Sequence, residues 1–327
     1  MSFNQFNRDF DEFDDDPYTH LLPKNRSKSE HRSGRHKPNH KSKVNQRQVI
    51  ENLADSSDRL EDFVPTYVAN FDPKHFERQW VIKSLGGFYR DQIITDVLSI
   101  VKKGKEANVY CCKANEKTGL DYIAAKLYRP RMFRHLRNDA AYKAGRFARD
   151  EAGKTIKGSR EKRAMGSKTN FGQKLDFAAW IGHEHRVHQQ LFQAQADVPQ
   201  PLSYRENVIL MEFIGEEAQA ARTLIDSTIT VSEAPALFSQ IMENVELMLR
   251  MNYIHGDLSA YNILYNRGAI KIIDFPQMVD ARTNPNALKF LARDIDRVYT
   301  YFADFGVVAD PNKITHEYWD AYQNAAL

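Results

Sequence analysis

The stretch from Tyr253 to Phe275 carries the side chains best suited to chemistry. It reads YIHGDLSAYNILYNRGAIKIIDF, so that Asn262 follows Asp257 by five positions and Asp274 ends the last apolar run. A phosphoryl-transfer site needs one carboxylate to orient the attacking oxygen, and an amide with a second carboxylate to hold magnesium against the phosphates. These are the hard oxygen ligands that magnesium prefers. Asp257 fits the first role, and Asn262 and Asp274 fit the other two.

Asp and Asn are also common in turns and caps, where their side chains bond the local backbone. Taken alone, Asp257 or Asp274 is explained more readily in that way. Their combination with Asn262 at this spacing is much harder to obtain by chance. The sequence therefore favours a phosphoryl-transfer site over three unrelated turn residues.

A lysine within a β-like run is an independent candidate. Lys126 lies in YIAAKLY, residues 122–128, between small and apolar neighbours. A lysine in such a run would ordinarily lie at a sheet edge or face solvent. The functional alternative is that it neutralises phosphate oxygens and is held by a carboxylate on the next helix, for which Glu184 in WIGHEHRVHQQL is the best candidate. The turn within VKKGKEANVY, residues 101–110, could lay backbone N–H groups over a triphosphate.

The elements that must position these residues differ between the two halves of the chain. Strand-like runs dominate the first half, where the turn at Gly104-Lys105-Glu106 begins an antiparallel meander. The elements expected there are, in order, one or two short helices over 76–98, strands at 98–104, 107–112 and 122–128, a helix over 175–196, and strands at 202–204 and 208–213.

The second half is expected to be mainly helical. Ser232 is a suitable N-cap and Pro235 falls in the first turn of a helix, where its missing N–H costs nothing. After that helix, strands at 263–265 and 270–273 flank an Asn-Arg-Gly turn, which is a hairpin signal. The hairpin places Asp257 and Asp274 at its two ends.

Five motifs, GKEANVY, AAKLY, MEFIG, HGDLSAYNILY and IIDFPQMVD, together resemble the RIO family of atypical serine/threonine protein kinases over residues 76–305. The resemblance implies an α+β, two-lobed protein-kinase-like fold, with a small N-lobe of antiparallel sheet plus helix, a mainly helical C-lobe, and ATP between them. Phe275-Pro276 follow Asp274 without the glycine of ordinary kinases, and the chain after them is too short for an activation segment and a peptide-docking lobe. Members of the family are similar in lacking both.

The resemblance also implies a role for each site residue. Asp257 would be the catalytic aspartate, with His255 as a structural support, and Asn262 and Asp274 would bind the metal, Mg²⁺ with Mn²⁺ as the alternative ion. Lys126 would contact the phosphates with Glu184 as its partner, and the backbones of Glu212 and Ile214 would meet the adenine. The phosphate-binding loop would consist of Gly104, Lys105, Glu106, Ala107, Asn108 and Val109. One departure is that Lys102 and Lys103 precede this loop where relatives often have Ser or Thr.

Charge is distributed unevenly along a chain whose formal net charge is only +3. Residues 1–16 carry a net −5, residues 24–47 a net +8 and residues 129–174 a net +10. The basic tract 24–47 has few large apolar residues and cannot bury enough surface to offset its ordering entropy. Either basic segment could contact RNA or a ribosomal particle, or simply be solvated surface.

The domain organisation that follows has four parts. They are a disordered charged tail (1–60), an N-terminal helical extension (61–97), a kinase N-lobe (98–214) with a flexible basic loop (129–174), and a kinase C-lobe (215–327).

Several classes of protein are disfavoured. No run of 18 apolar residues occurs and the N-terminus lacks the order of a signal peptide, so we expect a soluble cytoplasmic protein without a membrane partner. The two cysteines are adjacent, which excludes an ordinary disulfide or a structural zinc site and fits a reducing compartment.

The leading hypothesis is an ATP-dependent serine/threonine protein kinase that also phosphorylates itself, with a protein substrate that the sequence does not identify. One alternative is an ATPase-type assembly factor acting on ribosomal or other ribonucleoprotein particles. A less favoured one is a small-molecule phosphotransferase, since aminoglycoside and choline kinases share H-G-D-x-x-x-x-N but not GKEANVY or IIDFPQ.

Overall fold

The computed structural model describes residues 63–72, 75–129 and 170–327. The chain divides into two compact units, Met1–Asn45 and Gln46–Leu327, and every described residue belongs to the second. The predicted disordered tail, the basic tract 24–47 and nearly all of the basic loop 129–174 lie outside the described residues. The domain boundaries therefore stay a prediction.

Five antiparallel strands in the order β1-β2-β3-β5-β4 form the N-lobe sheet. Apolar residues dominate the middle strands, as expected for a sheet that is covered on both faces. The turn predicted after Lys103 joins β1 to β2. The strands are β1 (Ile94–Lys103), β2 (Ala107–Ala114), β3 (Tyr122–Tyr128), β4 (Pro201–Arg205) and β5 (Val208–Glu212).

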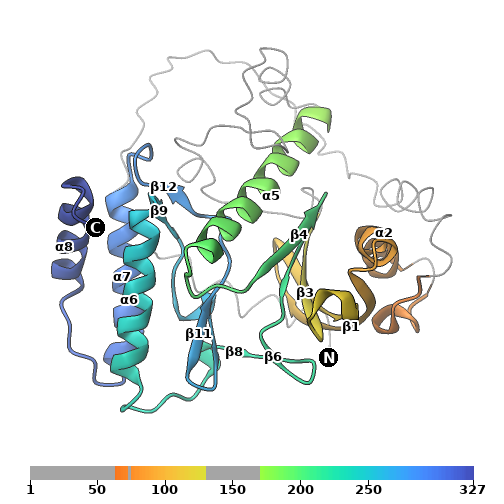
Figure 1. Ribbon diagram of the computed structural model, residues 1–327, viewed down its shortest axis with the longest axis horizontal. Coiled ribbons are helices and arrows are strands. Elements are labelled where there is room, and N and C mark those ends of the chain that lie inside the picture. Colours follow the sequence, from red (N-terminus) through yellow and green to blue (C-terminus); the bar gives the residue numbers. More distant parts are fainter. Residues whose placement is uncertain (1–62, 73–74, 130–169) are drawn as a thin grey trace, which may run out of the picture. The chain divides into compact units, whose positions relative to one another are not determined.

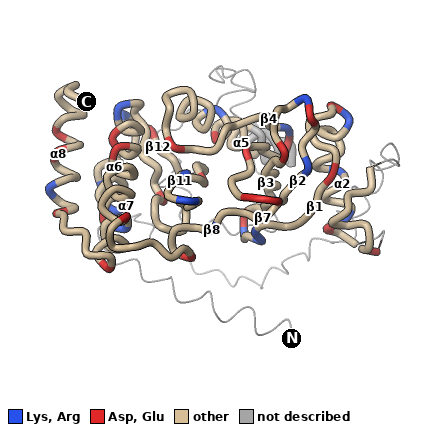
Figure 2. The backbone as a smooth tube through the Cα atoms, turned by 60° about the horizontal axis from the view of Figure 1, so that its bottom comes forward, with Lys and Arg blue, Asp and Glu red and all other residues tan. Residues whose placement is uncertain are grey.

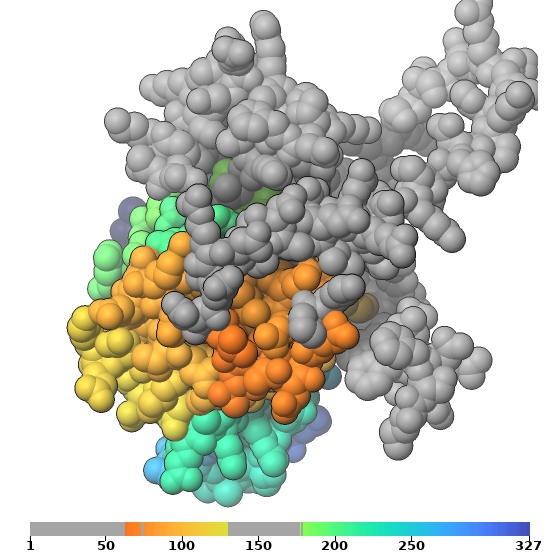
Figure 3. Space-filling view, turned by 90° about the vertical axis from the view of Figure 1, so that its right-hand side faces the viewer, coloured from red at the N-terminus to blue at the C-terminus, as the bar shows by residue number. Residues whose placement is uncertain are grey.

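Two helices cover opposite faces of this sheet (Figure 1). Helix α2 (Phe76–Arg90) buries Trp80 and Leu85 against one face, together with Tyr110 of β2. In the space-filling view of Figure 3, α2 (orange) lies beside the strands β1 and β2 (amber to yellow). Helix α5 (Asn170–Gln193) packs Ile181 against the other face, beside Tyr128. Successive residues of β3 face different helices, since Leu127 belongs to the cluster with α2 and Tyr128 to the cluster with α5.

The expected helical segment 76–98 is wrong in its second part. Helix α2 ends at Arg90, and β1 begins at Ile94. Ile94 and Val97 have the spacing of a helix face, but they pair with Ala114 and Cys112 of β2. Their β-branched side chains favour the strand, where pairing with β2 satisfies the backbone.

Helices dominate the C-lobe, and α6, α7 and α8 run side by side in Figure 1. Blue and red segments alternate along them in Figure 2, so both signs of charge are mixed there. Their apolar faces share one core that includes Leu237, Ile241 and Val298. The helices are α6 (Ala234–Arg250), α7 (Ala287–Ala303) and α8 (Pro311–Gln323).

Pro235 lies in the first turn of α6 as predicted, but the N-cap is Glu233 and not Ser232. The Ser232 hydroxyl bonds Thr230 Oγ1 at 2.9 Å. Glu233 reaches back and accepts hydrogen bonds from the backbone N and the hydroxyl of Thr230. Glu233 N in turn donates to Thr230 Oγ1 at 3.3 Å, so a reciprocal Thr230–Glu233 pair precedes the helix in place of the predicted Ser232 cap.

The predicted hairpin of the C-lobe is confirmed as β10 (Ile263–Asn266) and β11 (Ala269–Ile272). Its turn residues Arg267 and Gly268 both have positive φ, as a two-residue hairpin turn requires. The remaining elements are short. They are η2 (Thr66–Val68), η3 (Glu116–Thr118), β6 (Gly215–Glu216), β7 (Gln219–Ala220), β8 (Arg222–Thr223), η5 (Leu224–Asp226), β9 (Tyr253–Ile254), η6 (Ala260–Asn262) and β12 (Val279–Asp280).

Helix α5 contributes to the cores of both lobes. Ile181 belongs to the cluster on the N-lobe sheet, whereas Val187 and Leu191 belong to the core of the C-lobe. The predicted α+β, two-lobed, kinase-like fold is confirmed. None of the helices within the described ranges combines the length and the apolar character needed to cross a membrane.

Candidate active site

Lys126 joins the two lobes. Its Nζ lies 2.8 Å from Glu184 Oε1 on α5 and 2.6 Å from Asp274 Oδ1 in the C-lobe. The side chains of Lys126 and Glu184 are only 12% and 4% exposed. Burial alone would lower the pKa of the Lys126 ammonium, but the carboxylates of Asp274 and Glu184 hold that pKa well above its ordinary value. Lys126 is therefore a fixed cation between two anions.

The second oxygen of Glu184 is also occupied. Tyr128, two residues after Lys126 on the same face of β3, donates its hydroxyl hydrogen to Glu184 Oε2. Burial, and then the charge of Glu184, raise the pKa of Tyr128 well above its ordinary value, so the phenol stays protonated as a donor. With both oxygens engaged, Glu184 is held in one orientation.

Asp257 lies in the loop between β9 and η6, and its two carboxylate oxygens have different partners. Oδ1 pairs with Arg297 Nη1 of α7 at 2.9 Å, and Oδ2 lies 3.4 Å from Asn262 Nδ2. The same Asn262 amide nitrogen donates to the Asp257 carbonyl at 2.8 Å. The Asp257 side chain is 46% exposed. It is therefore oriented by neighbours and still open to a substrate.

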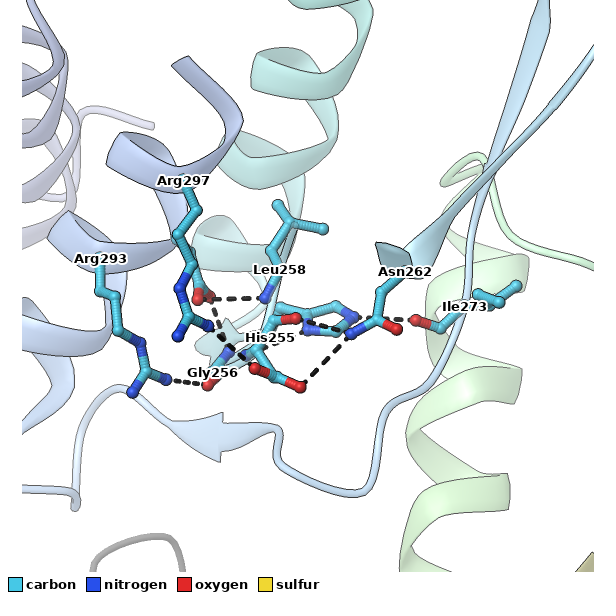
Figure 4. A network of polar contacts seen from close by, with 9 residues as sticks. His255, Gly256, Leu258, Asn262, Ile273, Arg293 and Arg297 are labelled. Atoms are coloured by element: carbon cyan, nitrogen blue, oxygen red, sulfur yellow. Dashed lines mark hydrogen bonds and ion pairs between the residues drawn. The ribbon is translucent and has the colours of Figure 1, made fainter. Parts of the chain in front are cut away.

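His255 is buried and ties this loop to the hairpin. Its Nδ1 accepts a hydrogen bond from Asp257 N at 3.3 Å, so its Nε2 is the donor to the Ile273 carbonyl at 3.1 Å. Burial lowers the pKa of His255, which keeps the ring neutral and suited to this tautomer. Figure 4 shows His255 between Gly256 and Ile273. The ring thus supports the loop.

The hairpin brings Asn262 next to Asp274. Ile273 N donates to the Asn262 carbonyl at 2.9 Å, one residue before Asp274. Asp274 itself has φ +75°, a left-handed conformation that is uncommon for a residue other than Gly but that Asp adopts more readily than most. This backbone conformation ends the strand direction, and the Asp274 side chain points to Lys126.

Two residues of α7 that the sequence reasoning missed hold the backbone around Asp257. Asp294 accepts hydrogen bonds from Gly256 N at 2.7 Å and Leu258 N at 3.1 Å, and Arg293 donates to the Gly256 carbonyl. Figure 4 shows Arg293 and Arg297 reaching from α7 toward this loop. Burial raises the pKa of Asp294 to about 7, although Arg293 and the two N–H donors act in the opposite direction.

A signal for Asp294 was present in the sequence. The buried face of α7 includes Phe290 and Val298, and Asp294 stands four positions from each, in the middle of that apolar stripe. A charged residue is rarely fully buried unless it is paired. Arg297 lies one position before Val298 and has no comparable signal.

The predicted phosphate-binding loop follows β1. A Cβ on Gly104 would lie 2.6 Å from the Ala107 carbonyl oxygen, so the turn requires a glycine there. Asn108 is buried, and its Oδ1 accepts from Gly104 N at 3.4 Å and from Arg129 Nη2 at 3.1 Å. Its amide nitrogen donates to Tyr110 Oη at 3.1 Å. The Asn108 side chain therefore braces the loop from the α2 side.

The other members of this loop are placed differently. Lys105 is exposed and Glu106 half-buried, and the Glu106 carbonyl accepts from Arg129 N at 2.8 Å. Ala107 packs on the α5 side, and Val109 pairs directly with Lys126. Ala107 and Val109 thus lie on the sheet face that carries Lys126, opposite to the face of Asn108.

Glu212 and Ile214 lie where the chain passes from β5 to β6. Glu212 N donates to the Gln200 carbonyl at 2.8 Å, and the Ile214 carbonyl accepts from Ala221 N at 2.9 Å. Gly215 follows with a positive φ, and a Cβ there would overlap the Gln219 carbonyl. This connection between the lobes is therefore tightly packed on its β7 side.

The oxygens at the hairpin end are of the kind that a divalent cation prefers. The Asn262 amide nitrogen is turned to Asp257, which leaves the amide oxygen for a cation, and Asp274 uses only Oδ1 for Lys126. No group of three or more His, Cys, Asp or Glu within the described ranges could hold a metal alone. Magnesium commonly binds through one or two side chains together with substrate phosphates and water.

Comparison with known proteins identifies relatives of this arrangement. A model of the RIO domain matches residues 108–314. The human serine/threonine-protein kinase RIO1 is 32% identical over 247 residues, which cover 72% of this chain and 40% of that protein. The RIO-type serine/threonine-protein kinase Rio1 of Haloferax volcanii is 29% identical over 216 residues, 65% of this chain and 66% of that protein. The chain thus spans about two fifths of the length of its human relative.

Proposed function

This chain belongs to the RIO domain family, and from that premise we propose that it is an ATP-dependent serine/threonine protein kinase, which transfers the γ-phosphoryl group of ATP to Ser or Thr hydroxyls, its own included. The relatives are named as serine/threonine-protein kinases. The single observation that carries the proposal is the contact of Lys126 with both Glu184 and Asp274, which brings a fixed cation to the end of the hairpin where Asn262 and Asp274 would hold a metal ion.

ATP would lie between the lobes, with its phosphates at Lys126 and beneath the loop Gly104–Val109. Asn262 and Asp274 would hold Mg²⁺, with Mn²⁺ as the alternative ion, and the bound ion would neutralise charge on the phosphates. The adenine would meet the hinge through the Glu212 carbonyl and the Ile214 N–H, since the Glu212 N–H and the Ile214 carbonyl are already used.

Asp257 would act on the acceptor. Its carboxylate positions the substrate hydroxyl and accepts the hydroxyl proton as the oxygen forms a bond to the γ-phosphorus. The bond from that phosphorus to the bridging oxygen breaks, and ADP leaves with the electron pair. Arg297 and Asn262 orient the carboxylate before the substrate arrives. Positioning and charge stabilisation supply most of the rate in this chemistry.

The test compares Asp257→Asn with the unaltered chain, using labelled ATP to follow autophosphorylation and transfer to a generic protein acceptor, and calorimetry to follow nucleotide binding. We expect phosphoryl transfer to fall by about 10² to 10⁴-fold while ATP binding is retained. Asp304→Asn, at the exposed C-cap of α7, is the matched control. Full transfer activity of the Asp257 variant would remove Asp257 from the mechanism.

Free phosphate should be measured in the same reactions. A chain that releases phosphate but labels no protein would favour the ATPase-type assembly factor instead. The basic segments that could contact RNA or a ribosomal particle are residues 24–47 and 129–174, and they lie almost wholly outside the described residues. That partnership and the cytoplasmic location therefore stay predictions.

A further inference from the structure

The register of the N-lobe sheet places a second lysine on the nucleotide side. Lys102 of β1 is paired with Val109 of β2, and Val109 is paired with Lys126 of β3. Residues directly opposite each other in paired strands point to the same face. Lys102, Val109 and Lys126 therefore form one row, and the Cα atoms of the two lysines are about 10 Å apart, two strand spacings.

The neighbouring Lys103 confirms this alternation. Lys103 is paired with Asn108, and its Nζ lies 3.7 Å from Glu77 Oε2 on α2. Side chains alternate between the two faces along a strand. The register is irregular between Ile100 and Lys102 but regular from Lys102 to Lys103, so Lys102 faces the side occupied by Lys126 while Lys103 faces α2.

The ionised side chains around Lys126 carry a net charge that a second lysine would balance. Lys126 is already paired with two carboxylates, so this trio carries a net negative charge. Lys102 is exposed and forms no ion pair with any described residue.

We propose that Lys102 is a second phosphate-binding lysine, which contacts the terminal phosphates of ATP from the β1 side of the cleft. The inference rests on the proposed nucleotide site. A triphosphate brings more negative charge than Lys126 can balance, since Lys126 is shared with Glu184 and Asp274. A lysine on a flexible stem next to the turn at Gly104 supplies an additional cation where those phosphates lie. Lys102 thus selects nucleotides with a diphosphate or triphosphate chain.

The experiment measures binding of ATP, ADP, AMP and adenosine, each with Mg²⁺, by calorimetry on the full chain. Lys102→Met should weaken ATP binding by about tenfold, the effect of one charged hydrogen bond. Binding of adenosine should not change. Lys103→Met is the matched control on the opposite face and should bind ATP like the unaltered chain, whereas Lys102→Arg should retain most of the affinity.

The outcomes separate this inference from the proposed function. If the unaltered chain binds no ATP, the nucleotide site itself is wrong and Lys102 has no role in it. If the unaltered chain binds ATP and Lys102→Met binds ATP equally well, only the role of Lys102 is overturned. The same holds if Lys102→Met loses the binding of ATP and of adenosine to the same extent. Lys102→Gln, a second uncharged variant, replaces the Met variant if that variant does not fold by circular dichroism.

Discussion

Lys126 Nζ and Asp274 Oδ1 lie 2.6 Å apart although 148 positions separate the two residues in the chain. The contact joins β3 of the N-lobe to the end of the hairpin of the C-lobe. Glu184 of α5 completes it at 2.8 Å. Three elements that are distant in sequence thus meet at one ammonium group. Removal of one partner should therefore change the stability of the fold or the activity of the site through the partners that remain.

Removal of Lys126 should destabilise the fold through Glu184. The Glu184 side chain is 4% exposed, so Lys126→Met leaves a buried carboxylate without its cation. We expect the free energy of unfolding in urea to fall by about 3 kcal/mol. The double variant Lys126→Met with Glu184→Gln removes the buried charge as well and should be more stable than the single variant. Equal stability of the two would contradict a buried, charged Glu184.

Removal of Arg297 should affect turnover more than stability. Arg297 and Asp257 are 38% and 46% exposed, so the loss of their ion pair should cost less than about 1 kcal/mol. The carboxylate of Asp257 loses one of its two orienting partners, and kcat should fall by about tenfold or more in Arg297→Gln. The KM for ATP should stay unchanged.

A suitable control for this prediction is Arg250→Gln, which removes an exposed pair with Glu246 on α6. Arg297→Lys should recover part of kcat because it restores a cation. A change confined to the KM for ATP would place Arg297 with the nucleotide and not with Asp257.

Asp294 should make stability depend on pH. Its pKa is raised from 3.8 to about 7, so between these values the native state holds a proton that the unfolded state has lost. The stability contribution of this group therefore falls as the pH rises through that window. Relative to Asp294→Asn, the unaltered chain should lose about 1 kcal/mol or more of unfolding free energy between about pH 5 and pH 7.5. A difference that stays constant or grows with pH would show that Asp294 is ionised in the native state.

Gly104→Ala should weaken ATP binding. The new Cβ would lie 2.6 Å from the Ala107 carbonyl, so the turn must shift and Gly104 N leaves Asn108 Oδ1. We expect the Kd for ATP to rise by about tenfold in calorimetry, the loss of about 1.4 kcal/mol. Gly119→Ala is the control, because Gly119 has φ +71° and open space around it. It should lower stability by about 1 kcal/mol and leave ATP binding unchanged.

Local patterns predicted most of the elements that carry the site. The Asn-Arg-Gly turn fixed the hairpin, and the hairpin brings Asn262 beside Ile273 and Asp274. The partner of Lys126 was inferred only as the best glutamate on the next helix, and the structure places Glu184 in contact with it. The hairpin is set by neighbours in sequence, the range over which periodicity and turn chemistry act. The Lys126–Glu184 pair spans 58 positions and was inferred instead from chemistry, since a phosphate-binding lysine needs a carboxylate to hold it.

The contacts that α7 makes with the loop around Asp257 were not predicted. Arg297 meets Asp257 across 40 positions, and nothing in the composition of α7 points to that loop. The start of β1 was missed for a related reason, since Ile94 and Val97 fit a helical spacing until β2 is present to pair with them. The role of the Asn108 side chain was not predicted either. Only the folded sheet shows that this side chain faces α2.

Helix α5 has a mechanical consequence. Ile181 is packed under the N-lobe sheet, and Leu191, almost three turns further along the same rigid rod, is packed in the core of the C-lobe. Moving one lobe relative to the other would therefore take one of these side chains out of its core. Helix α5 thus couples the position of the N-lobe sheet to the core of the C-lobe.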